Sequence, residues 1–147
     1  MDKLQTVEAI VNARKAHESQ MKKIEALLKG KEVENPTAVL KTECEFGQWL
    51  YDDNNHLKEL LGELFYTNLE TLHGRWHIEY SRLFEIFFKP KKKGFFSKAF
   101  GGDKVDGMEL DKAKLYYSEL EATTNELLKA ISSSQRRIEA LKEEKFH

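Results

Sequence analysis

The chain has 147 residues, 40% of them hydrophobic and 33% charged, so we expect one domain that can bury a core without disulfides. The formal net charge of −1 argues against nucleic-acid binding, which needs many phosphate-neutralising cations on one face. No run approaches the about 18 apolar residues of a membrane span, no apolar signal core follows Met1, and the single cysteine fits a reducing compartment, so we expect a cytoplasmic protein without a membrane span.

Helix-breaking residues are few, with two prolines and eight glycines, which favours helices over a many-turned β fold. Apolar residues at steps of three or four predict a first helix that ends before Gly30 and buries one face. His17 lies in the middle of this apolar stripe. The stripe consists of Leu4, Val7, Ile10, Ala13, His17, Met21, Ile24 and Leu28.

A polar turn separates this helix from a short second one, for which Asn35 and Pro36 predict the cap and the first helical position. Gly47 lowers helix stability, so its presence indicates a bend or a close approach of another backbone segment. The residues expected to share one side of this helix are Leu40, Cys44, Gly47 and Tyr51.

The strongest helical pattern in the chain predicts one long helix from Leu57 to Phe87. His73 and His77 continue a stripe that is otherwise aliphatic or aromatic. Because they are four residues apart on a helix, their side chains lie one above the other and can bind one ion. The whole stripe is Leu57, Leu61, Phe65, Leu69, His73, His77, Tyr80, Phe84 and Phe87.

Helical periodicity is lost in residues 88–107, where six lysines and two aspartates predict a flexible basic loop. A last helix follows, on which apolar and small polar residues again recur at steps of three or four. Four helices with one long connection predict an all-α four-helix bundle, a single domain over residues 1–147. The stripe of the last helix is Ala113, Tyr117, Leu120, Thr124, Leu127, Ile131, Ser134, Ile138 and Leu141.

His17, Cys44, His73 and His77 form a candidate metal site, because three imidazoles and one thiolate make a complete tetrahedral set for Zn²⁺. They come from three predicted helices and lie on faces expected to point inward, where bundles build metal sites. The alternative is packing: a lone histidine on an apolar face is usually a hydrogen-bonded core residue, and a lone buried cysteine is a small hydrophobe. Spacing alone leaves both explanations open.

Residues 44–50, Cys-Glu-Phe-Gly-Gln-Trp-Leu, with a helical histidine upstream and a His-x-x-x-His pair downstream, resemble the chemoreceptor zinc-binding domain family. The resemblance covers residues from about 15 to 80 and extends more loosely to the last helix. It implies that His17, Cys44, His73 and His77 are the zinc ligands. The chain departs from the family pattern at Gln20, where a tryptophan is usual, and in its longer lysine-rich loop.

The resemblance implies a zinc-binding sensory or regulatory module. Zinc occupancy, or oxidation of Cys44, would signal to a bacterial protein partner of chemotaxis or cyclic-di-GMP type. The family domain usually accompanies a chemoreceptor or a diguanylate cyclase, whereas here we expect it to stand alone. We do not expect an enzyme, because four protein ligands close the position that a catalytic zinc keeps open. The alternative is a metal-independent helical interaction protein, and a homodimer is compatible with both.

Several other residues have two interpretations each. Trp76 flanks the histidine pair and would shield a metal from water, or it is an ordinary core residue. Glu43, Glu45 and Glu79 would orient ligand imidazoles, although a solvated face is the default for each. His56 lies off the apolar stripe, so we expect it at the surface.

Overall fold

The computed structural model describes residues 1–31, 39–88 and 107–146. In these ranges the chain forms helices and no strand, so the predicted all-α fold is confirmed. No helix of this described part has the length and apolar character needed to cross a membrane. The helices are α1 (Lys3–Leu28), α2 (Glu45–Tyr51), α3 (Leu57–Leu61), α4 (Glu63–Phe87) and α6 (Gly107–Ala140), with 3₁₀ turns η1 (Asp53–Asn55) and η2 (Glu143–Phe146).

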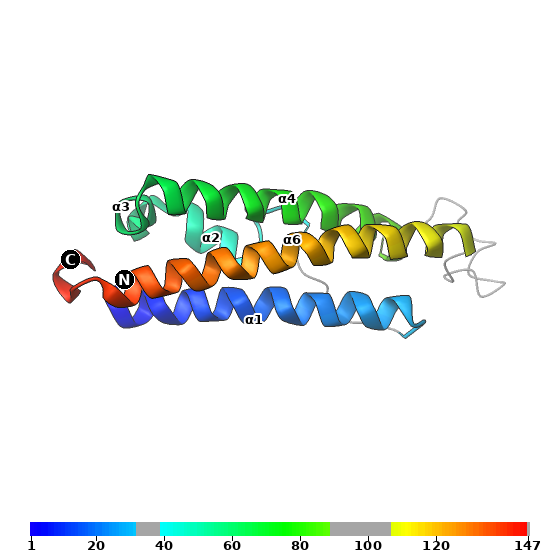
Figure 1. Cartoon of the computed structure of the whole chain (residues 1–147), viewed down its shortest axis with the longest axis horizontal. Coiled ribbons are helices and arrows are strands. Elements are labelled where there is room, and N and C mark those ends of the chain that lie inside the picture. The colour runs from blue at the N-terminus through cyan, green and yellow to red at the C-terminus, as the bar shows by residue number, and fades with distance from the viewer. Residues whose placement is uncertain (32–38, 89–106, 147) are drawn as a thin grey trace.

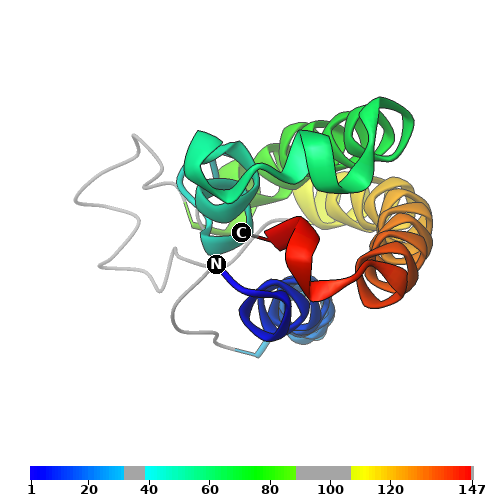
Figure 2. The same cartoon turned by 90° about the vertical axis from the view of Figure 1, so that its left-hand side faces the viewer.

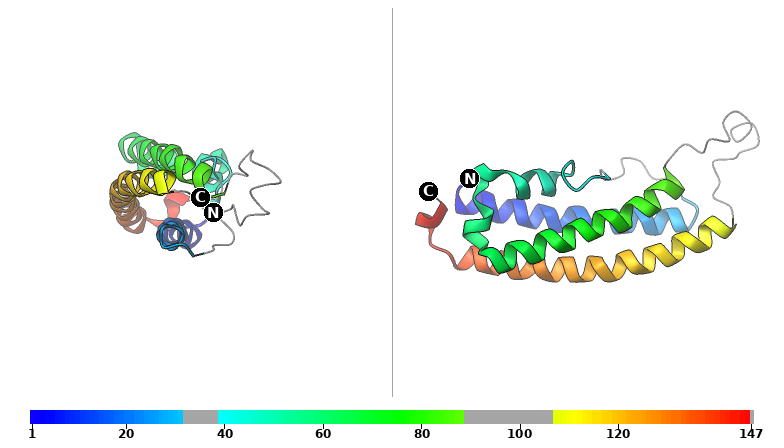
Figure 3. Two further views of the ribbon diagram at one scale, coloured as in Figure 1. Left: turned by 90° about the vertical axis from the view of Figure 1, so that its right-hand side faces the viewer. Right: turned by 90° about the horizontal axis from the view of Figure 1, so that it is seen from above.

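The three long helices α1, α4 and α6 lie lengthwise beside one another, and α2 fills the fourth corner of the bundle for part of its length (Figure 1). Seen from the end, α6 packs against both α1 and α4, while α2 packs against α1 (Figure 2). Successive helices at the four corners run in alternating directions (Figure 3, right). The predicted order of a long, a short and two more long helices is therefore confirmed.

Two predicted features lie outside the described residues. One is the start of the second helix at Asn35 and Pro36. The other is the basic loop of residues 88–107, of which only Phe88 and Gly107 are described. The loop stays a prediction, whereas the described residues before Glu45 are not helical, so the second helix starts later than predicted.

Helix α1 begins and ends where its sequence directs. The Asp2 side chain accepts a hydrogen bond from the Gln5 backbone N–H at 2.8 Å, and the Gln5 side chain accepts one from the Asp2 N–H at 3.0 Å, which forms a capping box. At the other end Gly30 has a φ of +81°, the left-handed conformation that ends helices. Most of the predicted stripe is buried, but Leu4 is exposed because Thr6 faces the core at this end of the bundle.

The helix predicted from Leu57 to Phe87 is in fact two helices. Gly62, with a φ of +84°, separates α3 from α4, and a residue in that conformation cannot continue an α-helix. Both α3 and α4 pack on α6, so the apolar pattern runs through the break without interruption. The periodicity therefore predicted the continuous buried face correctly but did not predict the break in the helix.

The second helix begins later than predicted. Leu40 is 56% exposed and precedes α2, which starts at Glu45 with Cys44 as its N-cap. The Cys44 Sγ accepts a hydrogen bond from the Gly47 N–H at 3.2 Å, in the place that a serine or aspartate oxygen usually takes. Apolar spacing does not show where a helix begins. The helical count therefore placed Cys44 inside the helix, whereas it is the residue that caps it.

Gly47 serves the close backbone approach that was one of its two predicted roles. A Cβ atom built there would lie 1.6 Å from the Lys41 carbonyl oxygen and 2.8 Å from the Lys41 carbonyl carbon. Only glycine lets the chain at Lys41 cross the first turn of α2. This crossing sets the position of Cys44, which lies between the two residues in sequence.

We expect Gly47→Ala to lower the free energy of unfolding by about 3 kcal/mol, because the new methyl group must displace backbone and not a flexible side-chain end. Urea denaturation of the metal-free protein measures the loss. Gly74→Ala is the matched control, since a Cβ on this glycine of α4 would lie 3.7 Å from the Lys41 side chain, an ordinary contact. We expect the control to be stabilised by about 0.5–1 kcal/mol through helix propensity. Equal effects of the two substitutions would contradict the assignment.

Candidate metal centre

Three of the four predicted ligands form a tight group inside the bundle. One ring nitrogen of each of His17, His73 and His77 lies within 4.8 Å of the other two. His73 and His77 are one turn apart on α4, and His17 faces them from α1. All three side chains are buried, with no more than 3% of their surface exposed. The inward direction that the helical count assigned to these histidines is confirmed.

Cys44 adjoins this group through His73. Its Sγ lies 3.3 Å from His73 Nε2, and the thiol is buried. With Zn–S and Zn–N bonds of about 2.3 and 2.0 Å, the sulfur-to-nitrogen edge of a tetrahedral site is about 3.5 Å. The edge between two nitrogens is about 3.3 Å, so the histidine nitrogens, which lie within 4.8 Å of one another, are near enough to share an ion after small side-chain rotations. The four donors fit zinc in type. In spacing, the three histidines form one group, and Cys44 lies outside that group but beside His73.

Hydrogen bonds to backbone carbonyls determine which nitrogen two of the histidines present to the site. The Nδ1 of His17 donates to the Ala13 oxygen, and the Nδ1 of His77 donates to the Val39 oxygen, both at 2.8 Å. The proton on Nδ1 leaves a lone pair on Nε2. In both residues this buried Nε2 has no hydrogen-bond partner among the residues that the structure describes. Metal-binding histidines have this arrangement, whereas a histidine that serves packing alone normally pairs its buried polar atoms.

Burial keeps the histidines neutral. Desolvation lowers the pKa of His17 to about 4 and that of His73 to about 2, with a further lowering from the neighbouring imidazoles. Burial also lowers the pKa of His77, and it raises the pKa of the Cys44 thiol. Neutral imidazole is the form that binds a metal, and a buried thiol gives up its proton when a cation compensates the charge. In these protonation states the side chains are suited to bind a cation.

Aromatic side chains enclose the group. Trp76 is fully buried, and its ring centroid lies 4.6 Å from that of His17 and 4.9 Å from that of His77. The rings of Phe46 and His73 are nearly perpendicular, with their centroids 4.7 Å apart. The Trp76 Nε1 donates to the Thr124 hydroxyl at 2.8 Å, which ties the indole to α6. Trp76 therefore has the contacts that its predicted shielding role requires.

The other candidate residues have separate environments. Glu79 is buried and accepts hydrogen bonds from the Thr123 hydroxyl, so it is not on a solvated face. Glu43 and Glu45 are exposed, as the default interpretation expected. His56 is exposed too, in a left-handed conformation at the end of η1.

Sequence reasoning missed the residues that orient the donors. The carbonyl groups of Ala13 and Val39 act through backbone, which carries no residue-type signal. Thr124 was recognised only as a member of the stripe on the last helix. Lys41 and Glu70, which form an ion pair beside Cys44, come from segments that sequence spacing does not connect.

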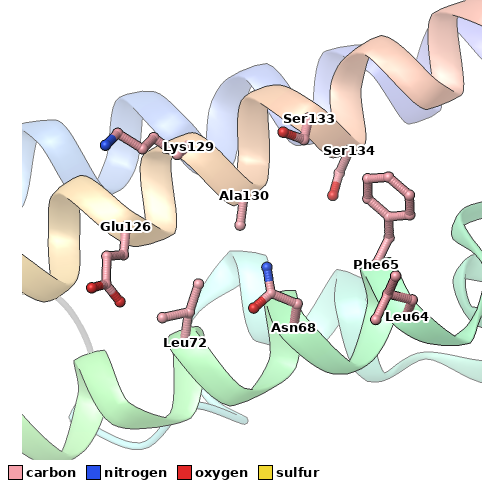
Figure 4. Close-up of a pocket in the computed structure, with 9 residues that line it drawn as sticks. All are labelled: Leu64, Phe65, Asn68, Leu72, Glu126, Lys129, Ala130, Ser133 and Ser134. Carbon is pink, nitrogen blue, oxygen red and sulfur yellow. The ribbon is translucent and has the colours of Figure 1, made fainter.

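A separate groove of about 530 Å³ lies between α4 and α6 (Figure 4). Leu64 and Phe65 line one end and Glu126 the other, with Leu72 and Ala130 between them. None of the four predicted ligands lines this groove. The candidate metal centre is therefore the buried group and not the surface cavity.

Residues 17–83 match the family model of the chemoreceptor zinc-binding domain. The matched interval begins at His17 and contains Cys44, His73 and His77. Comparisons with curated proteins and with solved structures return no match. The match confirms the resemblance inferred from the cysteine motif and the histidine pair.

The buried histidines make the metal-free protein sensitive to acid. His17 has a folded-state pKa of about 4, below the ordinary 6.5, so unfolding takes up a proton between these values and stability falls as the pH falls. We expect His17 alone to remove about 1.4 kcal/mol of unfolding free energy per pH unit in this interval. His73 and His77 steepen the slope.

Urea denaturation with a chelator present, between about pH 7 and 5, measures this slope. His17→Gln should reduce it, because glutamine does not titrate. A wild-type stability that does not vary over this range would show that the histidines are not held neutral.

Proposed function

We propose that this chain binds one Zn²⁺ ion through His17, Cys44, His73 and His77, since residues 17–83 match the family model of the chemoreceptor zinc-binding domain. The observation that carries the proposal is the pair of buried Nε2 atoms, on His17 and His77, whose Nδ1 protons go to backbone carbonyls. These lone pairs point to a ligand and not to packing, since a buried acceptor without a donor costs about 1–3 kcal/mol.

Each donor brings a different part of the bundle to the site. His17 belongs to α1, Cys44 caps α2, and the histidine pair belongs to α4. When bound, zinc supplies the divalent charge that favours the Cys44 thiolate. The carbonyls of Ala13 and Val39 keep the imidazole protons away from the site, and the rings of Trp76 and Phe46 exclude water. Occupancy of the site would thus hold three helices together.

We propose further that the domain is regulatory. A protein partner that binds the metal-loaded and metal-free arrangements with different affinities would respond to zinc occupancy. The family description, a chemoreceptor zinc-binding domain, supports a sensory context. We propose a bacterial signalling partner of chemotaxis or cyclic-di-GMP type. Oxidation of Cys44 by hydrogen peroxide would produce the same change by another route. The thiolate takes one oxygen atom to become a sulfenic acid while the peroxide is reduced to hydroxide, and a sulfenic acid is a poorer zinc donor than a thiolate.

Neither of the other two classes of function accounts for the donor arrangement. A metal-independent interaction protein could bury phenylalanine or leucine at the histidine positions without leaving polar atoms unpaired. A catalytic zinc would need an open coordination position, whereas four protein donors are available here. We therefore propose a closed zinc site without catalysis.

Elemental analysis of the purified protein, after zinc loading and removal of free metal, tests the proposal. We expect about one zinc per chain, and a large loss in Cys44→Ala and His17→Ala. His56→Ala is the control and should keep full occupancy, because this histidine is exposed and outside the site. Circular dichroism of each variant separates a lost ligand from a lost fold. Less than about half an equivalent in the wild type, or full binding by Cys44→Ala, would overturn the proposal.

A further inference from the structure

The four donors differ in how firmly the fold holds them. The three histidines lie on the long helices α1 and α4, within the core. Cys44 instead caps a helix of seven residues and follows a non-helical segment, residues 39–44, which we call the strap. Residues 39–43 of the strap are exposed or half-buried, and segments with few buried contacts open at lower free energy than core helices. The Cys44 thiol is therefore the donor whose position depends most on local contacts.

One carboxylate on α4 holds the strap in place. Glu70 Oε1 lies 2.6 Å from the Lys41 ammonium of the strap and also accepts a hydrogen bond from the Tyr51 hydroxyl at 3.2 Å. The same ammonium lies 5.4 Å from the centroid of the Tyr51 ring. The hydrogen bond from Lys41 lowers the pKa of Glu70, so this carboxylate is ionised at neutral pH. Glu70, which lies on α4, thus contacts both the strap and Tyr51, the last residue of α2.

A shift of Lys41 also moves Cys44. The Lys41 carbonyl oxygen lies against the backbone of Gly47, where even one added Cβ would clash, and 3.5 Å from Cys44 Sγ. The Lys41 side chain reaches α4 near Gly74, one residue beyond His73. A second contact anchors the start of the strap, the hydrogen bond from His77 to the Val39 carbonyl. The strap is therefore held to α4 on both sides of the site.

We propose that Glu70 is a positioning residue of the metal site, which through Lys41 and Tyr51 holds the strap against α4 and keeps Cys44 beside His73. Its effect is on rate: it limits how often the strap opens, and hence how fast Cys44 becomes accessible and how fast zinc exchanges. The inference deepens the proposed zinc function and rests on it for the exchange step alone. The access step concerns the chain without metal.

The exposure of the pair determines the size and the kind of effect. The Lys41 and Glu70 side chains are 42% and 31% exposed, so salt can screen them, and such pairs contribute little to global stability. We expect loss of the pair to raise the opening rate of the strap about fivefold, with little change in the melting temperature. Raised ionic strength should accelerate opening in the wild type and much less in the variants.

Alkylation of the metal-free protein by iodoacetamide tests the access step. Cys44 is the only cysteine of the chain, so the mass increase reports on this residue alone. We expect Glu70→Gln and Lys41→Met each to be alkylated about fivefold faster than the wild type, and the double variant to be no faster than either single one. Glu126→Gln is the matched control, because it removes an ion pair with Arg75 that joins α4 to α6 away from the strap. Equal rates in wild type and Glu70→Gln would overturn the inference.

Zinc transfer to an excess of a chromogenic chelator tests the exchange step. Release from the loaded Glu70→Gln protein should be about fivefold faster than from the wild type and from Glu126→Gln, at an unchanged stoichiometry. A wild type that holds no zinc would overturn the proposed function, while the alkylation rates would still decide the role of Glu70. A wild type that holds one zinc and releases it as fast as the Glu70 variant would overturn the positioning role alone.

Discussion

The lone pairs of two buried imidazole nitrogens are the constraint on which the interior of this bundle depends. His17 and His77 each donate the Nδ1 proton to a backbone carbonyl, which leaves Nε2 as a buried acceptor without a donor among the described residues. Such atoms reduce stability unless a cation or a proton donor reaches them. A core built for stability alone would use apolar side chains at these positions. The fold instead gives up stability to hold a preformed set of donors.

Different elements position different side chains of the candidate site. Helices α1 and α4 supply imidazoles from well-packed positions, and α6 packs against both. Thr124 extends that support by bonding the indole of Trp76, which separates the histidines from water. The strap and α2 are smaller elements, so the thiolate they carry is the donor that moves at least cost. The proposed site would thus combine a rigid histidine group with one adjustable ligand.

The fold and the candidate ligands could largely be predicted from sequence, because the spacing of apolar residues indicates which side chains face the core. Most of the stripes of α1 and α6 was predicted, although buried Thr6 and Gln20 of α1 were missed, and the inward direction of the histidines followed from these stripes. The prediction of helix boundaries was wrong where the pattern of buried residues does not follow the backbone conformation. Gly62 breaks a helix without breaking the buried face, and Leu40 lies on an exposed stretch before the cap at Cys44. Periodicity records what is buried, not whether the backbone between buried residues is continuous.

The sequence by itself determined the chemical identity of the donors, three imidazoles and one thiol, and that the helices would turn the imidazoles inward. Only the tertiary structure decided which ring nitrogen faces the site, because that choice depends on the carbonyls of Ala13 and Val39. It also decided that Cys44 lies against His73 and Lys41 against Glu70, in each pair 29 residues apart in the chain. These are contacts between separate elements, and their geometry comes from how the helices pack and not from any local pattern.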